Sequence, residues 1–257
     1  MSRMPLAPAE AQNPEALLRK ATLARTSGMR AKYAKRGLSQ DGTVDRTTRA
    51  MLLRQLYLSR MESRLFREAL QIAEDMVALA IMPDVARQDA ARACIGLGDS
   101  AGAIEHLRLA SRVSPPSRRA FHLWTLGSTL YLMGRASDAI GPLSRAARWG
   151  TIDKPLYLGQ LTLARLACGE TVEGLGAVRE LLADAPCGQG YGQFVLGELA
   201  FADGDFKAAT GYLLAFVRRT GGGRVALQVA LQGELKQAKR LISRARNKLR
   251  RAAPEGA

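Results

Sequence analysis

Side chains that carry catalytic chemistry are few in this sequence, and their spacing matches no reaction centre. The two histidines, His106 and His122, each lie in a helical stretch where a packing or surface role is expected. The three cysteines, Cys94, Cys168 and Cys187, are far apart and lack the spacing of metal ligands. Cysteines of this kind are typical of small packing groups in a reducing compartment. We therefore expect no metal site and a cytoplasmic protein.

Phosphate-binding, acid-base and membrane-spanning patterns are also missing from the sequence. RTGGGR at residues 219–224 has three glycines but lacks the Lys-Ser/Thr pair of a phosphate-binding loop and follows no predicted strand. The carboxylates are spread around predicted helices, so no acid-base pair is indicated. Apolar runs stop well before the ~20 residues that cross a bilayer, and residues 1–20 lack the apolar core of a secretion signal. These patterns predict a protein that is not an enzyme, needs no cofactor and has no transmembrane segment.

The net charge of +15 comes entirely from the two ends of the chain. Residues 1–49 hold 10 basic and 4 acidic side chains, residues 218–257 hold 11 and 2, and residues 50–217 hold 17 of each. The middle is therefore neutral. The apolar content of the whole chain, 47%, favours a globular domain or an array over disorder. The basic flanks need an explanation of their own.

The neutral middle is built from a repeat. Gly98, Gly134, Gly169 and Gly204 follow one another at intervals of 36, 35 and 35 residues, each midway through an Ala- and Leu-rich segment of helical periodicity. Five positions after each glycine stands a small residue: Ala103, Ala139, Gly174 and Ala209. The segment SRLFREALQIAEDM shows the same spacing once more upstream. The units start near residues 50, 84, 120, 155 and 190.

Glycine and a small residue at these places serve a helix hairpin. The glycine ends the first helix in the left-handed conformation, and the small residue lets the second helix pack closely. Together with Leu126-Gly127 and Leu196-Gly197, the pattern resembles that of the tetratricopeptide repeat family, W-x-x-L-G-x-x-Y, A-x-x-x-F, P, over residues 50–219. The resemblance implies an all-α, right-handed superhelical solenoid of about five helix-turn-helix repeats. It also implies a scaffold or adaptor that binds another protein.

One aromatic residue is displaced by one position from the family pattern. The family has tryptophan three residues before the leucine of Leu-Gly; this chain has Leu123 there, and Trp124 comes next. Because one residue is about 100° of helix rotation, Trp124 and, in the fifth unit, Phe194 are expected to face the concave groove. Helical spacing then predicts an apolar and aromatic groove formed by Phe121, Trp124, Ser128, Tyr131, Tyr191, Phe194, Glu198 and Phe201.

Such a groove suits an amphipathic helix or an extended segment of a partner protein. Arg54 and Arg92 occupy the inward positions of the first two units, so that end is expected to be polar and basic. The alternative is that the aromatic residues pack against neighbouring helices, or under the C-terminal helix, and bind nothing. Aromatic stripes at helical spacing are common in helix cores.

Both flanks are expected to be basic and helical. In residues 1–49, Asn13 suits a helix cap, Pro14 a first turn, and Ser27-Gly28 a break, so two short helices are expected, with a degenerate repeat as one interpretation. Residues 224–252 form a predicted amphipathic helix whose first half caps the solenoid. Its second half gathers Lys236, Lys239, Arg240, Arg244, Arg246, Lys248, Arg250 and Arg251.

This basic cluster supplies the alternative function. It would bind a polyanion, either nucleic acid or an anionic membrane surface, unless it is simply a solvated helix end. Aromatic residues that stack on bases are absent from residue 217 onward, so contact with nucleic acid would be electrostatic and sensitive to salt.

Overall fold

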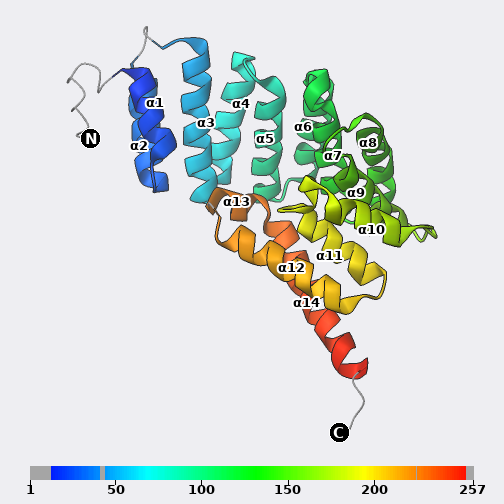
Figure 1. The fold of residues 1–257 in the computed structure, drawn as a ribbon. Helices are drawn as coiled ribbons and strands as arrows, with labels where there is room; N and C mark the ends of the chain where they lie inside the picture. The colour runs from blue at the N-terminus through cyan, green and yellow to red at the C-terminus, as the bar shows by residue number, and fades with distance from the viewer. Residues whose placement is uncertain (1–12, 41–43, 224, 253–257) are drawn as a thin grey trace. The chain divides into compact units, whose positions relative to one another are not determined.

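The computed structural model describes residues 13–40, 44–223 and 225–252. These residues form fourteen α-helices and one short 3₁₀ helix, with no strand among them (Figure 1). The chain divides into two compact units, the first ending at Val113 and the second beginning at Ser114. Within each unit consecutive helices pack on one another as hairpins. The expectation of an all-α, helical-repeat protein is confirmed.

The first unit contains three helix hairpins. Their helices are α1 (Pro14–Leu23) and α2 (Ser27–Leu38), α3 (Arg46–Glu62) and α4 (Phe66–Leu79), and α5 (Pro83–Leu97) and α6 (Ser100–Val113). Each hairpin also packs on the next, α2 against α3 and α4 against α5. The basic N-terminal segment therefore supplies a hairpin of the same kind as the two that follow it.

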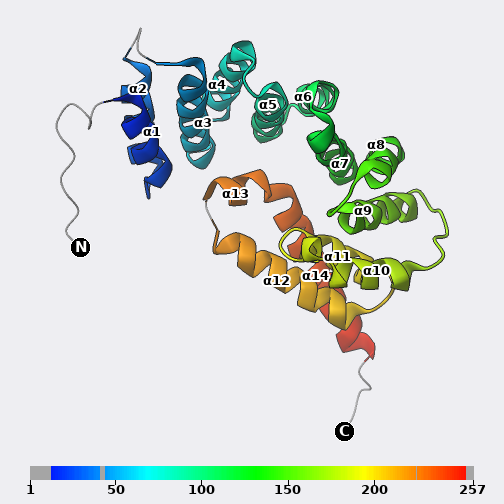
Figure 2. The ribbon, with the colours of Figure 1, turned by 45° about the horizontal axis from the view of Figure 1, so that its top comes forward.

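The second unit contains three further hairpins and two C-terminal helices. The hairpins are α7 (Pro116–Leu132) with α8 (Ala136–Trp149), α9 (Lys154–Ala167) with α10 (Leu175–Asp184), and α11 (Gly192–Ala202) with α12 (Phe206–Gly221). The 3₁₀ helix Pro186–Gly188 connects α10 to α11. Short α13 (Val225–Ala230) leads into α14 (Gln232–Ala252), which packs mainly on α12 (Figure 2).

The turns inside the hairpins depend on one backbone position. Gly98, Gly134, Gly169 and Gly204 follow α5, α7, α9 and α11, and all four are left-handed, with φ of 77° to 82°. The predicted role of these glycines is confirmed. At the same place after α3, 34 residues before Gly98, stands Arg64, which also has positive φ (57°). A residue with a Cβ atom is strained in this conformation. The turn after α3 therefore keeps the same geometry although it lacks the glycine that favours it.

Small residues set the distance between the two helices of a hairpin. Ala69, Ala103, Ala139 and Ala209 are all fully buried. Gly127 of α7 lies so near α8 that an added Cβ would be 2.4 Å from Leu143, and Gly197 of α11 has the same relation to Leu213 of α12, at 2.5 Å. The missing side chain of each glycine therefore lets a leucine of the second helix pack directly on the backbone of the first helix. This close packing is the structural role of the glycine of Leu-Gly in these two hairpins.

The fourth predicted repeat departs from this plan. Gly174 was expected inside the second helix, but it precedes α10 as its N-cap residue and has φ of 71°. Helix α10 is therefore short, and Leu182 is its one buried residue. Arg179 holds α10 in place, because its guanidinium forms ion pairs with Asp203 and Asp205 in the turn between α11 and α12.

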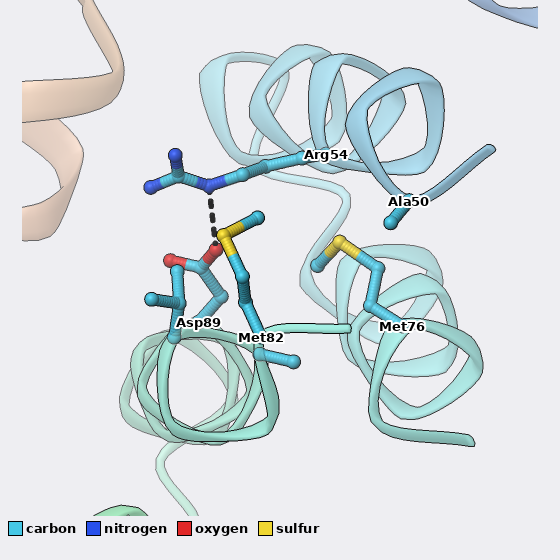
Figure 3. A pocket seen from close by; sticks show the side chains of 7 residues that line it. Ala50, Arg54, Met76, Met82 and Asp89 are labelled. Atoms are coloured by element: carbon cyan, nitrogen blue, oxygen red, sulfur yellow. Dashed lines mark hydrogen bonds and ion pairs between the residues drawn. The ribbon is translucent and has the colours of Figure 1, made fainter. Parts of the chain in front are cut away.

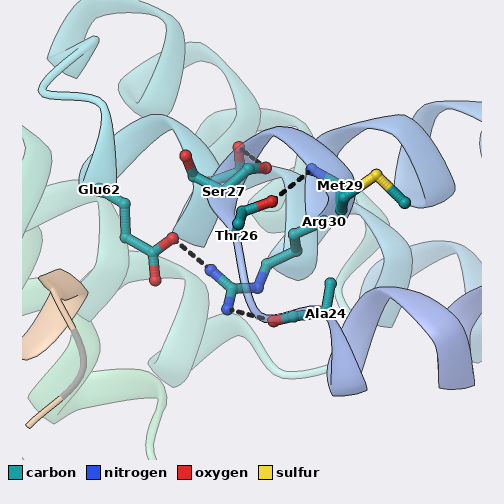
Figure 4. A network of polar contacts seen from close by, with 7 residues as sticks. Ala24, Thr26, Ser27, Met29, Arg30 and Glu62 are labelled. Carbon is teal, nitrogen blue, oxygen red and sulfur yellow. Dashed lines mark hydrogen bonds and ion pairs between the residues drawn. The ribbon is translucent and has the colours of Figure 1, made fainter.

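The N-terminal hairpin is attached to α3 by buried polar contacts. Asn13 caps α1 by accepting a hydrogen bond from the Ala16 amide, 3.0 Å away. Arg30 of α2 pairs with Glu62 at the end of α3, and both side chains are buried (Figure 4). The hydroxyl of Ser59 donates to the carbonyl of Ser27, at 2.8 Å. The Arg30–Glu62 ion pair and the Ser59–Ser27 hydrogen bond therefore fix the hairpin on α3, in addition to apolar packing.

Candidate functional site

Trp124 lies at the centre of an aromatic cluster inside the second unit. Its ring centroid is 5.9 Å from that of Tyr157 on α9, 5.0 Å from that of Tyr191 beside α11, and 5.7 Å from that of Phe121. Only 9% of Trp124 is exposed. The expectation that it lines an open groove is corrected: a rotation of one residue turns it toward the next hairpins, whose tyrosines cover it.

Phe194 is likewise a core residue. It is 0% exposed, and its ring stacks against Phe216 of α12 with centroids 5.3 Å apart. Tyr191 packs on both rings and is itself partly buried. Phe194 therefore joins the helices of its own hairpin, as the alternative interpretation of the aromatic stripe expected, and its placement in the groove is corrected for this physical reason.

Other residues of the predicted groove divide into an accessible and a buried set. Phe121 is the most accessible, with 37% of its surface exposed, and Tyr131 and Phe201 are partly exposed. Ser128 and Glu198 are buried. The residues of the predicted groove on first helices α7 and α11 thus separate into accessible aromatic side chains and buried polar side chains.

Glu198 is a buried carboxylate beside this aromatic cluster, and the buried Glu234 on α14 lies near it. Its Oε1 accepts a hydrogen bond from Nε2 of Gln237 on α14, at 2.8 Å. Burial raises the pKa of Glu198 from 4.5 to about 7; nearby Glu234 also raises it, whereas Gln237, Tyr131 and Arg240 lower it. A hydrogen bond from the Tyr131 hydroxyl is among the causes that lower this pKa, whereas by the stricter geometry of a normal hydrogen bond Oε2 of Glu198 has no partner among the described residues.

Several other polar atoms in this region are buried without a hydrogen-bond partner in the part of the chain that the structure describes. They are Nε1 of Trp124, Oγ of Ser128, and both amide atoms of Gln160 on α9. Gln160 is completely buried. The sequence analysis missed it, although a lone amide within the apolar run LYLGQLTLA was a signal. Buried polar atoms left unpaired are costly and rare, so these side chains reduce the stability of the second unit.

A second polar cluster lies in the first unit and contains Arg54 and Arg92. Nε of Arg54 is 3.2 Å from Oδ2 of Asp89 (Figure 3). On the other side of the carboxylate, Nη1 of Arg92 is 3.3 Å from Oδ1. Asp89 is only 2% exposed in its side chain, against 36% for Arg54 and 40% for Arg92. The hydroxyl of Tyr57 donates to the Asp89 carbonyl, at 2.8 Å. Two accessible guanidiniums thus share one buried carboxylate, which leaves an excess positive charge.

The cavity beside Arg54 is too small for a ligand. Met76, Met82 and Asp89 contribute to its walls, and its volume is about 10 Å³ (Figure 3). That volume is near the smallest that holds a single water molecule. Arg54 and Arg92 can therefore act only through the outer surface of their guanidinium groups.

Helix α14 presents its basic residues to solvent. All eight cations predicted to bind polyanions are exposed, namely Lys236, Lys239, Arg240, Arg244, Arg246, Lys248, Arg250 and Arg251. Arg244 also lies over the ring of Phe201, 5.0 Å from its centroid. Arg240 donates to the Gln237 side chain, at 2.7 Å. Apart from these two, the basic residues are not drawn into the packing of α14.

The histidines and cysteines form no centre of their own. His122 is buried, and burial together with nearby Arg87 lowers the pKa of His106. Cys94 is buried, but Cys168 is exposed, so the expected packing role does not hold for Cys168. No group of three potential metal ligands occurs among the described residues. Within the same residues, no helix combines the length and the apolar character that crossing a membrane requires.

Comparison with known proteins finds no matching family model and no matching curated protein. Among solved structures, the chain is similar to a TPR repeats protein from Bacteroides fragilis. The two are 15% identical; the match covers 92% of this chain and 99% of that chain, with a TM-score of 0.36. The description of this chain as a helical-repeat protein follows from its own hairpins and glycine turns.

Proposed function

We propose that the chain is a non-enzymatic scaffold that binds a segment of a partner protein on the first helices of its hairpins. The observation that carries this proposal is the exposed ring of Phe121 on first helix α7, which packs on Trp124 at the centre of the aromatic cluster. An accessible aromatic ring held in place by other rings offers preformed apolar contact area to a side chain of a partner.

The partner's chemistry follows from the accessible side chains. Phe121, Tyr131 and Phe201 offer aromatic surface to an apolar side chain. In the first unit, Arg54 and Arg92 offer guanidinium groups to a carboxylate. An amphipathic segment with apolar anchors and mixed polar groups fits the first-helix surface of either unit.

Site-specific crosslinking tests the proposal. A photoreactive phenylalanine analogue is placed at Phe121 on first helix α7 and, as a matched control, at Trp149 on second helix α8, since both aromatic side chains are exposed in the same unit (37% and 48%). A partner captured from Phe121 and not from Trp149 is then purified, and its affinity is measured. Phe121→Ala is expected to weaken binding by about tenfold, as for an aromatic anchor, and Trp149→Ala to leave it unchanged. Equal capture at both positions, or equal affinities, would refute the proposal.

A further inference from the structure

Helix α14 takes the position of a first helix in the second unit. Like α9 on α8, it packs on the second helix of the preceding hairpin, here α12, and it also touches α11. The contacts with first helix α11 run in the same direction along both helices: Tyr191 with Glu234, Glu198 with Gln237, and Phe201 with Arg244. Its buried residues are Glu234, Ala238, Leu241, Ile242 and Ala245.

A first helix normally gives a second face to its own hairpin partner. On α7 and α11 this face contains Gly127 and Gly197, which receive leucines of α8 and α12. If Glu198 is aligned with Gln237, Gly197 corresponds to Lys236 on α14. The face that continues from Lys236 carries Lys239, Ser243, Arg246 and Arg250 and is exposed. No helix in the described part of the chain covers these side chains, and the end of α14 extends away from α11 and α12 (Figures 1 and 2).

The exposed face combines an apolar edge with unbalanced positive charge. Ile242 and Leu249 are seven residues apart, so they lie on one side of the helix; Ile242 is buried against the second unit, whereas Leu249 is 40% exposed and forms the apolar edge. Lys239 and Arg246 flank them with the same spacing. Residues 235–252 contain no Asp or Glu, and no ion pair joins the α14 cations to a carboxylate among the described residues. The face therefore lacks both an apolar cover and counter-charges.

We propose that this face of α14, defined by Lys239, Arg246, Leu249 and Arg250, docks an acidic amphipathic helix of a partner protein. A leucine-like side chain of that helix would cover Leu249, and its Glu or Asp side chains would pair with the flanking cations, as in a helix pair with charged edges. The proposal rests on the scaffold function and gives it a second partner surface.

A polyanion is less suited to this face than an acidic helix. The apolar edge at Leu249 gains nothing from phosphates, and no aromatic residue follows Phe216 to stack on bases. A helix also fits geometrically, because α14 already occupies the position of a first helix and the exposed face is the one that receives a second helix in α7 and α11. Tighter binding of nucleic acid than of an acidic helix is therefore the competing outcome that the test must distinguish.

The test uses the full chain and three fluorescent probes, with binding measured by anisotropy at about 0.15 M salt. The probes are a synthetic helix with Leu in a heptad seam and Glu beside it, the same composition with the seam scrambled, and a single-stranded oligonucleotide. We expect the ordered acidic helix to bind at least about tenfold more tightly than the scrambled one. Equal binding of the two peptides would overturn the proposal, as would tighter binding of the oligonucleotide than of the ordered helix.

Variants separate the apolar edge from the charge. Leu249→Ala is expected to weaken the ordered helix about fivefold and leave the oligonucleotide unchanged, whereas Arg246→Glu with Arg250→Glu is expected to weaken both by about tenfold or more. The matched control is Arg108→Glu with Arg112→Glu, an exposed pair four residues apart on α6. Loss of binding in this control, or an ordered helix indifferent to Leu249→Ala, would contradict the assignment. Because Phe121 is not involved, failure here is distinct from failure of the crosslinking experiment.

Discussion

The two units differ in how their most buried polar side chains are paired. In the first unit, Asp89 is enclosed by Arg54 and Arg92, and Arg30 is paired with Glu62. In the second unit, Gln160 is buried with neither amide atom paired among the described residues, and Oε2 of Glu198 is unpaired as well. Paired groups hold helices together, whereas unpaired groups reduce stability. The contrast therefore separates buried polar residues that stabilise the fold from buried polar residues that destabilise it.

The largest test of this contrast is removal of one partner of the buried ion pair in the first unit. Glu62→Ala leaves the buried Arg30 guanidinium without its carboxylate, so we expect a loss of about 3–5 kcal/mol in the free energy of unfolding. Denaturant titration measures the change. The control is Glu68→Ala, whose carboxylate pairs with Arg60 but is 55% exposed, and for which we expect a loss below about 1 kcal/mol. Similar losses in the two variants would break the comparison.

The second test replaces the buried carboxylate of Glu198 in the second unit. Folded Glu198 keeps its proton up to about pH 7, whereas the unfolded group releases it near its ordinary pKa of 4.5. The native state therefore binds more protons between these values, and its stability falls as pH rises through them. We expect Glu198→Gln to be more stable than the natural chain at about pH 8, by at most about 3 kcal/mol, and the difference to vanish near about pH 4.

Urea titrations of Glu198→Gln at several pH values measure this difference. Glu180→Gln is the control, since Glu180 is exposed on α10 of the same unit, and no change in the pH dependence is expected for it. If the difference between Glu198→Gln and the natural chain is constant across the pH range, the pKa of Glu198 is not raised in the folded state and the expectation for this residue is wrong.

A third test removes an unpaired amide. Gln160→Met keeps the approximate size of the side chain and eliminates two unpaired polar atoms, so a gain of about 1–2 kcal/mol in unfolding free energy is expected. Gln88→Met on α5 is the matched control, because Gln88 is also buried but has no atom in the unpaired set. Thermal and urea unfolding measure both. A gain in Gln88→Met equal to that in Gln160→Met would show that the two units do not differ.

The smallest expected effect concerns the hairpin turns. Arg64 holds in the first unit the left-handed position that Gly134 holds in the second, and Arg64 is exposed. Arg64→Gly should therefore stabilise the chain by about 0.5–1 kcal/mol, and Gly134→Ala should destabilise it by about 1 kcal/mol. Urea midpoints with unchanged slopes provide the measurement. Destabilisation of Arg64→Gly would mean that the arginine side chain contributes more than its backbone strain costs.

Local patterns predicted the hairpins because their causes are local. A glycine is needed wherever the backbone is left-handed, and Gly98, Gly134, Gly169 and Gly204 all meet that need. The rule fails at Arg64 and at Ala80, which are left-handed without being glycine, so there the fold overrides the preference of the residue. Gly174 is left-handed as glycine allows, but at a helix start instead of packed inside a helix.

The candidate site was less predictable, because it depends on which elements cover a helix face. Helical spacing placed Trp124 and Phe194 away from their own packing stripe, but the same spacing cannot tell whether that face meets solvent or another helix. Tyr191 covers the first and Phe216 the second. Gln160 escaped notice for a related reason: an amide within an apolar helix is informative only when its surroundings show that nothing pairs with it.

The sequence by itself determined the period of the repeat, the helix hairpins, the left-handed turns and the basic, amphipathic character of the C-terminal helix. Each of these follows from backbone conformation or from periodicity within one segment. Only the tertiary structure decided that the aromatic stripe is mostly core, that Glu198 and Gln160 are enclosed, and that one face of α14 is exposed. The physical reason is that burial depends on side chains that come from other helices, and residue spacing along one helix does not contain that information.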